Sequence, residues 1–267
     1  MTNWQQIRYE TLGPVARLSH DRPQRSNAQS VQLLDELDAA LSQAIGDPDI
    51  RVIVLAGTGK HFSAGHDLKD AAMHRRQITP EDRYQFEDER YLGYCLKLWD
   101  APKPVIAQVQ GACIAAGFMV ANMCDLVVAS DDAFFADPVV NSFGAAAVEV
   151  LVHPWVMGLR QAKHFLYTGG RMSAAEALAI GMVNQVVPRA ELKAATLALA
   201  EKIAQSTPFA LRLMKRSLNR TADIQGFRAA LNAHFDTHQL SHMSTEAQQR
   251  QAAGFDATIE VARTRLA

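Results

Sequence analysis

Short apolar runs alternate along the chain with segments whose apolar residues recur at helical spacing. Nearly unbroken apolar runs are typical of strands in a parallel sheet that is covered on both faces. Such runs lie at residues 15–20, 51–57, 104–111 and 125–130, and residues 133–137 predict a further short strand. The first half of the chain therefore predicts a sheet whose strands are joined by helices.

Helical spacing first appears between the first two predicted strands. Apolar residues recur there from Val31 to Ile45, every third or fourth position, as in a helix with one buried face. Ser30 is the predicted N-cap of this helix and Gly46 its predicted stop. Residues 115–124, rich in small side chains, predict a second helix that again separates two strands.

The C-terminal third changes character, because helical patterns dominate from Arg160 onward. Ser173 and Glu176 have the spacing of a capping box, and Gly181 is a predicted terminator of the helix that they begin. Residues 191–206 predict a further, alanine-rich helix. The pattern as a whole predicts an α/β core that leads into a helical C-terminal region.

Composition bounds the class of protein. With 267 residues, 48% of them apolar, the chain is long enough for a large buried core. Its 27 basic and 28 acidic residues nearly balance, and no basic block predicts a nucleic-acid partner. The N-terminal segment does not resemble a secretory signal, and no apolar run approaches a membrane span. We therefore expect a cytoplasmic protein that binds neither nucleic acid nor membrane.

Several familiar motifs are incomplete or ambiguous. The sequence "AGTGK", ending at Lys60, lacks two residues of a phosphate-binding loop, and no GxGxxG follows a strand. His234, His238 and His242 stand four residues apart on a predicted helix, a spacing that suits zinc. Nothing else in that helix supplies supporting contacts, so polar surface or subunit-contact histidines are the favoured interpretation. Three cysteines without paired spacing are predicted to be reduced core thiols: Cys95, Cys113 and Cys124.

Two segments share one design, in which a predicted strand runs into a turn of small residues. They are "VIVLAGTGKHFSAGHDL", beginning at Val52, and "VIAQVQGACIAAGFMV", beginning at Val105. Small side chains let a ligand approach the backbone, and two N–H groups that converge there form an oxyanion hole. Close packing of helix on sheet also selects alanine and glycine, so the pattern alone leaves both interpretations open.

Five motifs, in order, carry a resemblance to a known family. They are "RPQRSNA" at residues 22–28, "FSAGHDL" at 62–68, "KPVIAQVQGACIAAG" at 103–117, "MCDLVVAS" at 123–130 and "EALAIGMVNQVV" at 176–187. With them the chain resembles the enoyl-CoA hydratase/isomerase, or crotonase, superfamily.

The resemblance implies a fold, a ligand and an assembly. The fold is an α/β ββα superhelix of stacked, mainly parallel sheets at residues 1–195, followed by a helical trimerisation region at residues 196–267. The ligand is an acyl-CoA thioester, with coenzyme A as part of the substrate and with no separate cofactor or metal. The assembly is a homotrimer or a homohexamer.

The resemblance also assigns site residues. The backbone N–H groups of His66 and Ala116 match the two oxyanion donors. Further positions match residues of the acyl-CoA site: Arg25, Ala28, Ala64, Gly65, Asp67, Leu68, Gly117, Met119 and Val139. Hydratases of the superfamily use two glutamates to handle water across a double bond. Met119 and Val139 occupy those two positions here, and neither side chain can move a proton.

Any proton transfer therefore needs another group. Glu149, in "FGAAAVEVLVHPW", lies where some isomerases of the family place an acid, and burial in so apolar a run predicts a raised pKa. A salt bridge or a helix-start role is the alternative. The His66 imidazole, as in family decarboxylases, and Asp137 are further candidates. The segment from Leu68 to Leu98 predicts a helical lid, with these candidate residues: Tyr84, Phe86, Asp88, Glu89 and Tyr91.

Three functions remain open at this point. The leading interpretation is an acyl-CoA enzyme that works through a thioester enolate, with isomerisation favoured over hydration. Decarboxylation or hydrolysis of a carbon–carbon bond is the second, because it needs the oxyanion hole but not two glutamates. The third is an acyl-CoA-binding protein without catalysis.

Overall fold

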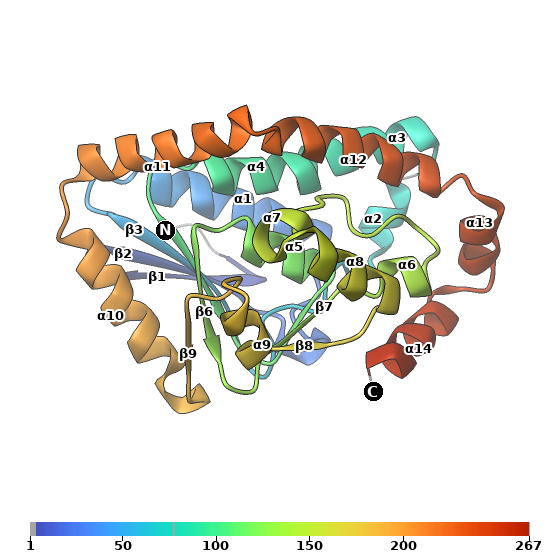
Figure 1. The fold of residues 1–267 in the computed structure, drawn as a ribbon, viewed down its shortest axis with the longest axis horizontal. Coiled ribbons are helices and arrows are strands. Elements are labelled where there is room, and N and C mark those ends of the chain that lie inside the picture. Colours follow the sequence, from blue (N-terminus) through green and yellow to red (C-terminus); the bar gives the residue numbers. More distant parts are fainter. Residues whose placement is uncertain (1–3, 77, 267) are drawn as a thin grey trace.

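A computed structural model describes residues 4–76 and 78–266, which form two sheets surrounded by helices (Figure 1). Within these residues the larger sheet has six strands in the order β1, β2, β3, β4, β6, β9. Only β1 pairs antiparallel in it, and the other neighbours are parallel. The strands are β1 (Ile7–Leu12), β2 (Val15–His20), β3 (Val52–Gly57), β4 (Val105–Val109), β6 (Leu126–Ser130) and β9 (Gln185–Val187).

The central strands are buried on both faces, as their apolar runs predicted. On β3, Val52 and Val54 pack in a cluster with helix α10, whereas Ile53 and Leu55 belong to the main core with helix α1. The alternation follows from the two-residue period of a strand, which sends successive side chains to opposite faces. The two helices are α1 (Val31–Gly46) and α10 (Leu192–Ala204).

The local start and stop signals are mostly confirmed. The Ser30 hydroxyl accepts a hydrogen bond from the Leu33 N–H at 3.2 Å and so caps α1. Gly46 is the last residue of α1 and does not stop it in a left-handed conformation, because the chain leaves through Asp47 in an extended one. The capping box of Ser173 with Glu176 is present.

A second, smaller sheet carries the turn that begins helix α5. Its strands lie in the order β5, β7, β8, with β5 parallel to β7 and β7 antiparallel to β8. The short strand predicted at residues 133–137 is β7 of this sheet. The elements are β5 (Ala112–Ile114), α5 (Ala116–Asn122), β7 (Phe134–Ala136) and β8 (Met172–Ser173).

The predicted lid is helical and lies under the C-terminal helices. It contains α2 (Ala71–Arg75), α3 (Pro80–Glu87), a π-helical turn (Asp88–Leu92) and α4 (Gly93–Asp100). Helices α11 and α12 run end to end along α4 and α3, and α13 and α14 fold back beside α6 (Figure 1). The C-terminal helices are α11 (Pro208–Ile224), α12 (Phe227–Ser241), α13 (Thr245–Ala252) and α14 (Phe255–Leu266).

Short helices complete the framework. Four follow β7 and β8, and two single 3₁₀ turns lie elsewhere: α6 (Val139–Ser142), α7 (His153–Met157), α8 (Leu159–Thr168), α9 (Ala174–Ala179), and the turns Pro23–Arg25 and Arg189–Glu191. None of the helices in residues 4–76 and 78–266 has the length and apolar character that crossing a bilayer requires. The three cysteines are buried and unpaired, as expected for core thiols.

Helix α10 corrects one expectation about assembly. The region from residue 196 onward was expected to mediate trimerisation, but its first apolar side chains, Leu199 and Ile203, pack with Leu192 on the sheet of their own chain. The expected boundary between residues 195 and 196 also falls inside α10. Helix α11 instead leaves large apolar side chains exposed: Phe209, Leu213, Met214, Leu218 and Ile224.

An exposed apolar face of this kind marks an interaction surface, and we expect it to join subunits. Leu218→Glu, at a side chain that is 63% exposed, should lower the mass measured by light scattering at micromolar concentration. Gln205→Glu adds the same single negative charge at the exposed end of α10 and should leave the mass unchanged. A wild-type protein that is already monomeric would contradict the expectation.

Candidate functional site

The "SAGHD" turn is held between two other segments of the chain. On one side, the Ser63 N–H donates to the Ala112 carbonyl at 3.1 Å, and the Ile114 N–H donates to the Ser63 carbonyl at 3.0 Å. On the other side, the Gln29 N–H donates to the Gly65 carbonyl at 2.8 Å. The two small-residue turns singled out in the sequence are therefore adjacent in the fold.

The closeness of these turns explains two of the glycines. A Cβ atom on Gly117 would lie 2.7 Å from the Ser63 carbonyl oxygen, a distance that no real Cβ adopts. Gly65 has a φ of +95°, and a Cβ built there would lie 3.4 Å from the Ala116 nitrogen. Gly65 and Gly117 are thus required by close backbone approach and by positive φ.

Each turn presents one backbone N–H without an internal partner. Ala115 has a φ of 50° and precedes the first residue of α5, and its own N–H donates to the Ala136 carbonyl at 2.9 Å. The N–H groups of Ala116 and His66, in contrast, donate no hydrogen bond to any described residue. The first N–H groups of a helix have no partner within it, so Ala116 is free to donate to a ligand.

The His66 side chain reaches a buried glutamate from a distant loop. Its Nε2 lies 3.2 Å from Glu149 Oε2, and the Glu149 side chain is 8% exposed. The other carboxylate oxygen of Glu149 lies 3.6 Å from His238 Nε2 on α12. On its face, the His66 ring stacks on Tyr91 with centroids 3.8 Å apart. Glu149 therefore has an imidazole at each oxygen.

A second buried carboxylate, which the sequence analysis did not select, lies nearby. Glu87 is the last residue of α3, and its Oε2 accepts a hydrogen bond from Gln239 Nε2 at 2.6 Å. The same oxygen lies 3.8 Å from His238 Nε2. Glu87 precedes Tyr91 by four residues in a helical segment, which puts both on one face. That spacing is the only sequence signal that points to Glu87.

The histidines of α12 are not surface residues, which corrects the favoured sequence interpretation. His238 is 2% exposed, and its Nε2 lies 3.0 Å from His242 Nε2. His234 points elsewhere, with its Nε2 2.9 Å from the Val148 carbonyl. Glu87, His238 and His242 bring three ligand-type atoms within 4.8 Å of one another. Because Gln239 and Glu149 already contact this group, we interpret it as a hydrogen-bonded network.

The two buried carboxylates titrate in opposite directions. Burial and the negative charge of Glu149 raise the pKa of Glu87 to about 8. Burial also raises the pKa of Glu149, but the charge and hydrogen bond of His66 and the charge of His238 outweigh it and lower that pKa to about 2. The raised pKa expected for Glu149 is therefore wrong, and it is found at Glu87. At neutral pH the pair holds one proton.

These groups line one cavity of about 190 Å³. Apolar and polar side chains from the turn, the lid, the loop after β7 and the C-terminal helices enclose it. Among the residues predicted for the site, those that line it are Ala64, His66, Leu68, Val139 and Glu149, and from the lid Tyr91. Arg83, Glu87, His238 and His242 also line it. The cavity joins the "SAGHD" turn to the two carboxylates.

Asp137 does not line this cavity. It is fully buried, its Oδ1 accepts from the Val139 N–H at 3.1 Å, and its Oδ2 accepts from the Val148 N–H at 3.3 Å. Its Oδ2 also lies 3.3 Å from His153 Nε2. These contacts hold the start of α6, the residue before Glu149 and the start of α7. Met119 is likewise buried in the core, behind the turn.

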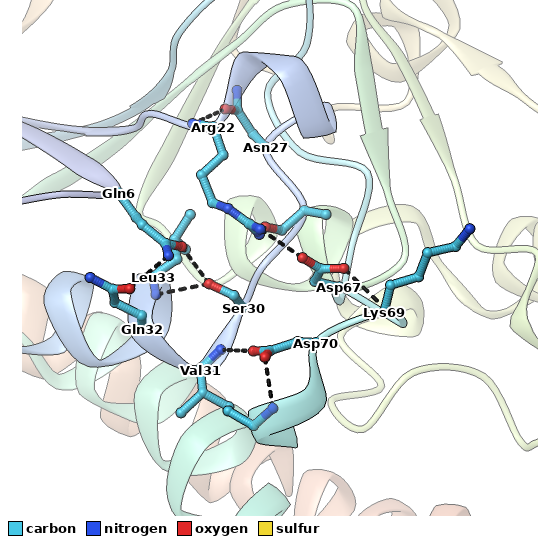
Figure 2. A network of polar contacts seen from close by, with 12 residues as sticks. Gln6, Arg22, Asn27, Ser30, Val31, Gln32, Leu33, Asp67, Lys69 and Asp70 are labelled. Atoms are coloured by element: carbon cyan, nitrogen blue, oxygen red, sulfur yellow. Dashed lines mark hydrogen bonds and ion pairs between the residues drawn. The ribbon is translucent and has the colours of Figure 1, made fainter. Parts of the chain in front are cut away.

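Arg25 and Asp67 line a separate cavity beside the turn. Asp67 pairs with Arg22, whose Nη2 lies 2.8 Å from Asp67 Oδ2, while Arg22 Nη1 donates to the Ala28 carbonyl at 2.5 Å (Figure 2). Asp70 accepts from the first N–H of α1 and from an N–H of α2 (Figure 2). This network holds the "SAGHD" turn against α1 and fixes the path of the chain after the turn.

The remaining lid candidates lie outside the site. Tyr84 is 43% exposed and donates through its hydroxyl to Asp236 on α12 at 3.0 Å. Phe86 is buried and packs edge-on against Tyr91. Asp88 and Glu89 are exposed and do not line the cavity, whereas the neighbouring Glu87 does.

Comparison with known proteins agrees with this architecture. The family model described as enoyl-CoA hydratase/isomerase matches residues 10–263. One relative is EchA13 of Mycobacterium tuberculosis, whose name describes it as an enoyl-CoA hydratase. It is 40% identical over 255 residues, which cover 88% of this chain and 80% of that protein. The chain therefore belongs to the enoyl-CoA hydratase/isomerase family, the crotonase superfamily.

Solved structures agree with the family assignment. A crystal structure of a Mycobacterium smegmatis protein is 48% identical, covers 88% of this chain and 94% of its own, and has a TM-score of 0.84. An enoyl-CoA hydratase/isomerase from Xanthobacter autotrophicus Py2 is 33% identical, covers 98% of both chains and has a TM-score of 0.90. The crotonase fold expected from the sequence is thus confirmed.

The contact between the two turns can be tested at Gly117. Gly117→Ala would push a methyl group against the Ser63 carbonyl, so it should destabilise the protein by roughly 1–3 kcal/mol and weaken acyl-CoA binding. Gly46→Ala is the matched control, because a Cβ there has open space around it. Thermal unfolding and calorimetric titration measure both effects. Equal stability of the two variants would contradict the close approach.

The raised pKa of Glu87 predicts a pH-dependent stability. The pKa of Glu87 is about 8 in the folded protein, above its ordinary value of 4.5. Ionisation therefore favours the unfolded chain, and the free energy of unfolding falls as pH rises between these two values. Glu87→Gln cannot ionise, so its Tm relative to wild type should increase from about pH 5 to about pH 9. Glu89→Gln, at an exposed acid, should show no such trend. A difference that is constant with pH would oppose the assignment.

Proposed function

We propose that this protein is an acyl-CoA enzyme that moves a double bond by proton transfer through a thioester enolate. The observation that carries the proposal is the buried Glu149 carboxylate, which lines the cavity beside the turn of His66. Its substrate is an enoyl-CoA in which the proton to be removed lies next to the thioester carbonyl. Family membership supports the thioester, and the geometry supports the proton transfer.

The thioester oxygen would be held by the N–H groups of His66 and Ala116. Both lack partners among the described residues, and the two turns that carry them are in contact. An enolate places a full negative charge on that oxygen, and donors fixed beforehand stabilise it by several kcal/mol. The start of α5 adds positive potential at Ala116, which favours the same charge.

Coenzyme A would bind along the outside of the same turn. Arg25 and Lys69 line the second cavity, and the exposed Arg25 side chain would meet the phosphates there. Ala28, Gly65 and Asp67 would shape the backbone path beside it. The acyl group would enter the cavity past Ala64, Leu68 and Val139, which line it, whereas Gly117 and Met119 lie behind the lining. No further cofactor or metal is part of this proposal.

Glu149 would act as the base. It is ionised at neutral pH, since His66 and His238 hold its pKa low. Burial alone pushes that pKa upward, so a substrate that separates the carboxylate from either imidazole makes it a stronger base. His66 is the alternative base, because its Nδ1 is buried without a hydrogen-bond partner among the described atoms.

Isomerisation fits these residues better than hydration by the family's two-glutamate arrangement. The positions of those glutamates hold Met119 and Val139, which leave no carboxylate on either side of a water there. Isomerisation needs only the removal of a proton from one carbon and the delivery of a proton to another. A buried carboxylate in the wall of the cavity can begin that sequence without an activated water.

Glu149→Gln keeps the shape of the side chain and removes the base. Its kcat on a 3-enoyl-CoA should fall by roughly 10²-fold or more, while acyl-CoA binding changes little. Exchange of the C2 proton in deuterated buffer should fall in parallel. Glu246→Gln, at an exposed acid of α13, is the control. Full activity of the Glu149 variant would transfer the role of base to His66.

A further inference from the structure

Two glutamates from distant segments face one nitrogen atom in this cavity. Glu149 Oε1 lies 3.6 Å and Glu87 Oε2 lies 3.8 Å from Nε2 of His238. Glu149 comes from the loop after α6, Glu87 from the end of α3, and His238 from α12. The single imidazole nitrogen therefore connects the two carboxyl groups.

Glu87 has the surroundings of a group that carries a proton. It is 4% exposed, lines the cavity and is held by Gln239 Nε2 at 2.6 Å. The charged and titratable groups around it are Glu149 from the loop, His238 and His242 from α12, and Arg83 from its own helix. Two ionised carboxylates in one small buried cavity repel each other strongly, so one keeps a proton.

The chain interrupts its helix directly after Glu87. The five residues Asp88–Leu92 form a π-helical turn between α3 and α4. Such turns are rare and occur frequently at functional sites. This turn places Tyr91 in the cavity as well, against the His66 ring. The lid thus brings an acid and an aromatic ring into the site from one short segment.

We propose that Glu87 is the second catalytic residue, a carboxylic acid that delivers a proton to the distal carbon of the substrate while Glu149 removes one next to the thioester. This inference rests on the proposed function and adds to it the donor of the second proton. It also assigns a role to a residue at neither of the two family glutamate positions, which hold Met119 and Val139.

The step balances without a co-reactant. Glu149 takes the proton from C2, the C2–H bond breaks, and its electron pair forms the dienolate whose charge lies on the thioester oxygen. Glu87 gives its O–H proton to C4, where a C–H bond forms, and the double bond ends between C2 and C3. The enzyme is then left with a protonated Glu149 and an ionised Glu87.

His238 would restore the starting state. Its Nε2 faces both carboxyl groups, so it can give a proton to the ionised Glu87 and then take the proton of Glu149. His242, whose Nε2 lies 3.0 Å from the same atom, holds the imidazole in place. The raised pKa of Glu87, about 8, and the low one of Glu149 drive the proton in this direction.

The test separates the two proton transfers. For wild type, Glu87→Gln and the exposed control Glu89→Gln, one measures C2 exchange in deuterated buffer and conversion of a 3-enoyl-CoA to its 2-enoyl isomer. Glu87→Gln should keep C2 exchange and its acyl-CoA affinity but lose conversion by roughly 10²-fold. Glu89→Gln should retain both. Glu87→Asp, which restores an acid, should recover part of the conversion.

A second measurement needs no variant. The measurement is a single turnover of the wild-type protein with a substrate deuterated at C2. If Glu87 supplies the proton at C4, the product carries no deuterium at C4. Transfer of the label from C2 to C4 shows that one base carries the proton, and it overturns the inference. So does full conversion by Glu87→Gln, or an equal loss of exchange and conversion, which indicates a structural role. Absence of C2 exchange in wild type instead refutes the proposed function.

Discussion

The site depends on one close contact, that between the backbone of the "SAGHD" turn and the start of α5. The Ser63 carbonyl lies where a side chain at residue 117 would be, and parallel bridges on both sides prevent the turn from moving away. This contact demands glycine at Gly117 and a positive φ at Gly65. It also leaves two N–H groups without internal partners and directs the His66 ring toward Glu149. The small residues that the packing of the turn requires are thus the same ones that a backbone binding site for a ligand would require.

The groups that could move protons are held by a different part of the fold. Asp137, a candidate acid in the sequence, accepts the N–H groups of Val139 at the start of α6 and of Val148 beside Glu149, so it helps to fix the position of that glutamate. The lid supplies Glu87, and α12 supplies His238 and fastens the lid through Gln239 and through the Tyr84 hydroxyl. The backbone donors belong to the sheet framework, whereas the carboxylates belong to the loop, the lid and α12.

This division explains how much the sequence could predict. Strands, caps and small-residue turns are local patterns, and those of β2, α1 and the two turns are found as expected. The meeting of Glu87 with His238 is a contact between distant segments, which no periodicity encodes. Burial of Glu149 was predictable from its apolar neighbours, but the sign of its pKa shift depended on His66 and His238. Likewise, the apolar side chains of α10 predicted a buried face, but not that this face packs on the sheet of the same chain.

A backbone oxyanion site tolerates changes of side chain, because its donors do not depend on residue type. The carboxylates of such a site can therefore relocate without loss of enolate stabilisation, provided that their charges remain compatible with burial. Here the two glutamates share one imidazole and have opposite pKa shifts, so near neutral pH one carboxyl group keeps a proton while the other is ionised. A cavity in this state has both a proton acceptor and a proton donor before substrate arrives. That pairing suits the proton shift that we propose better than it suits the addition of water.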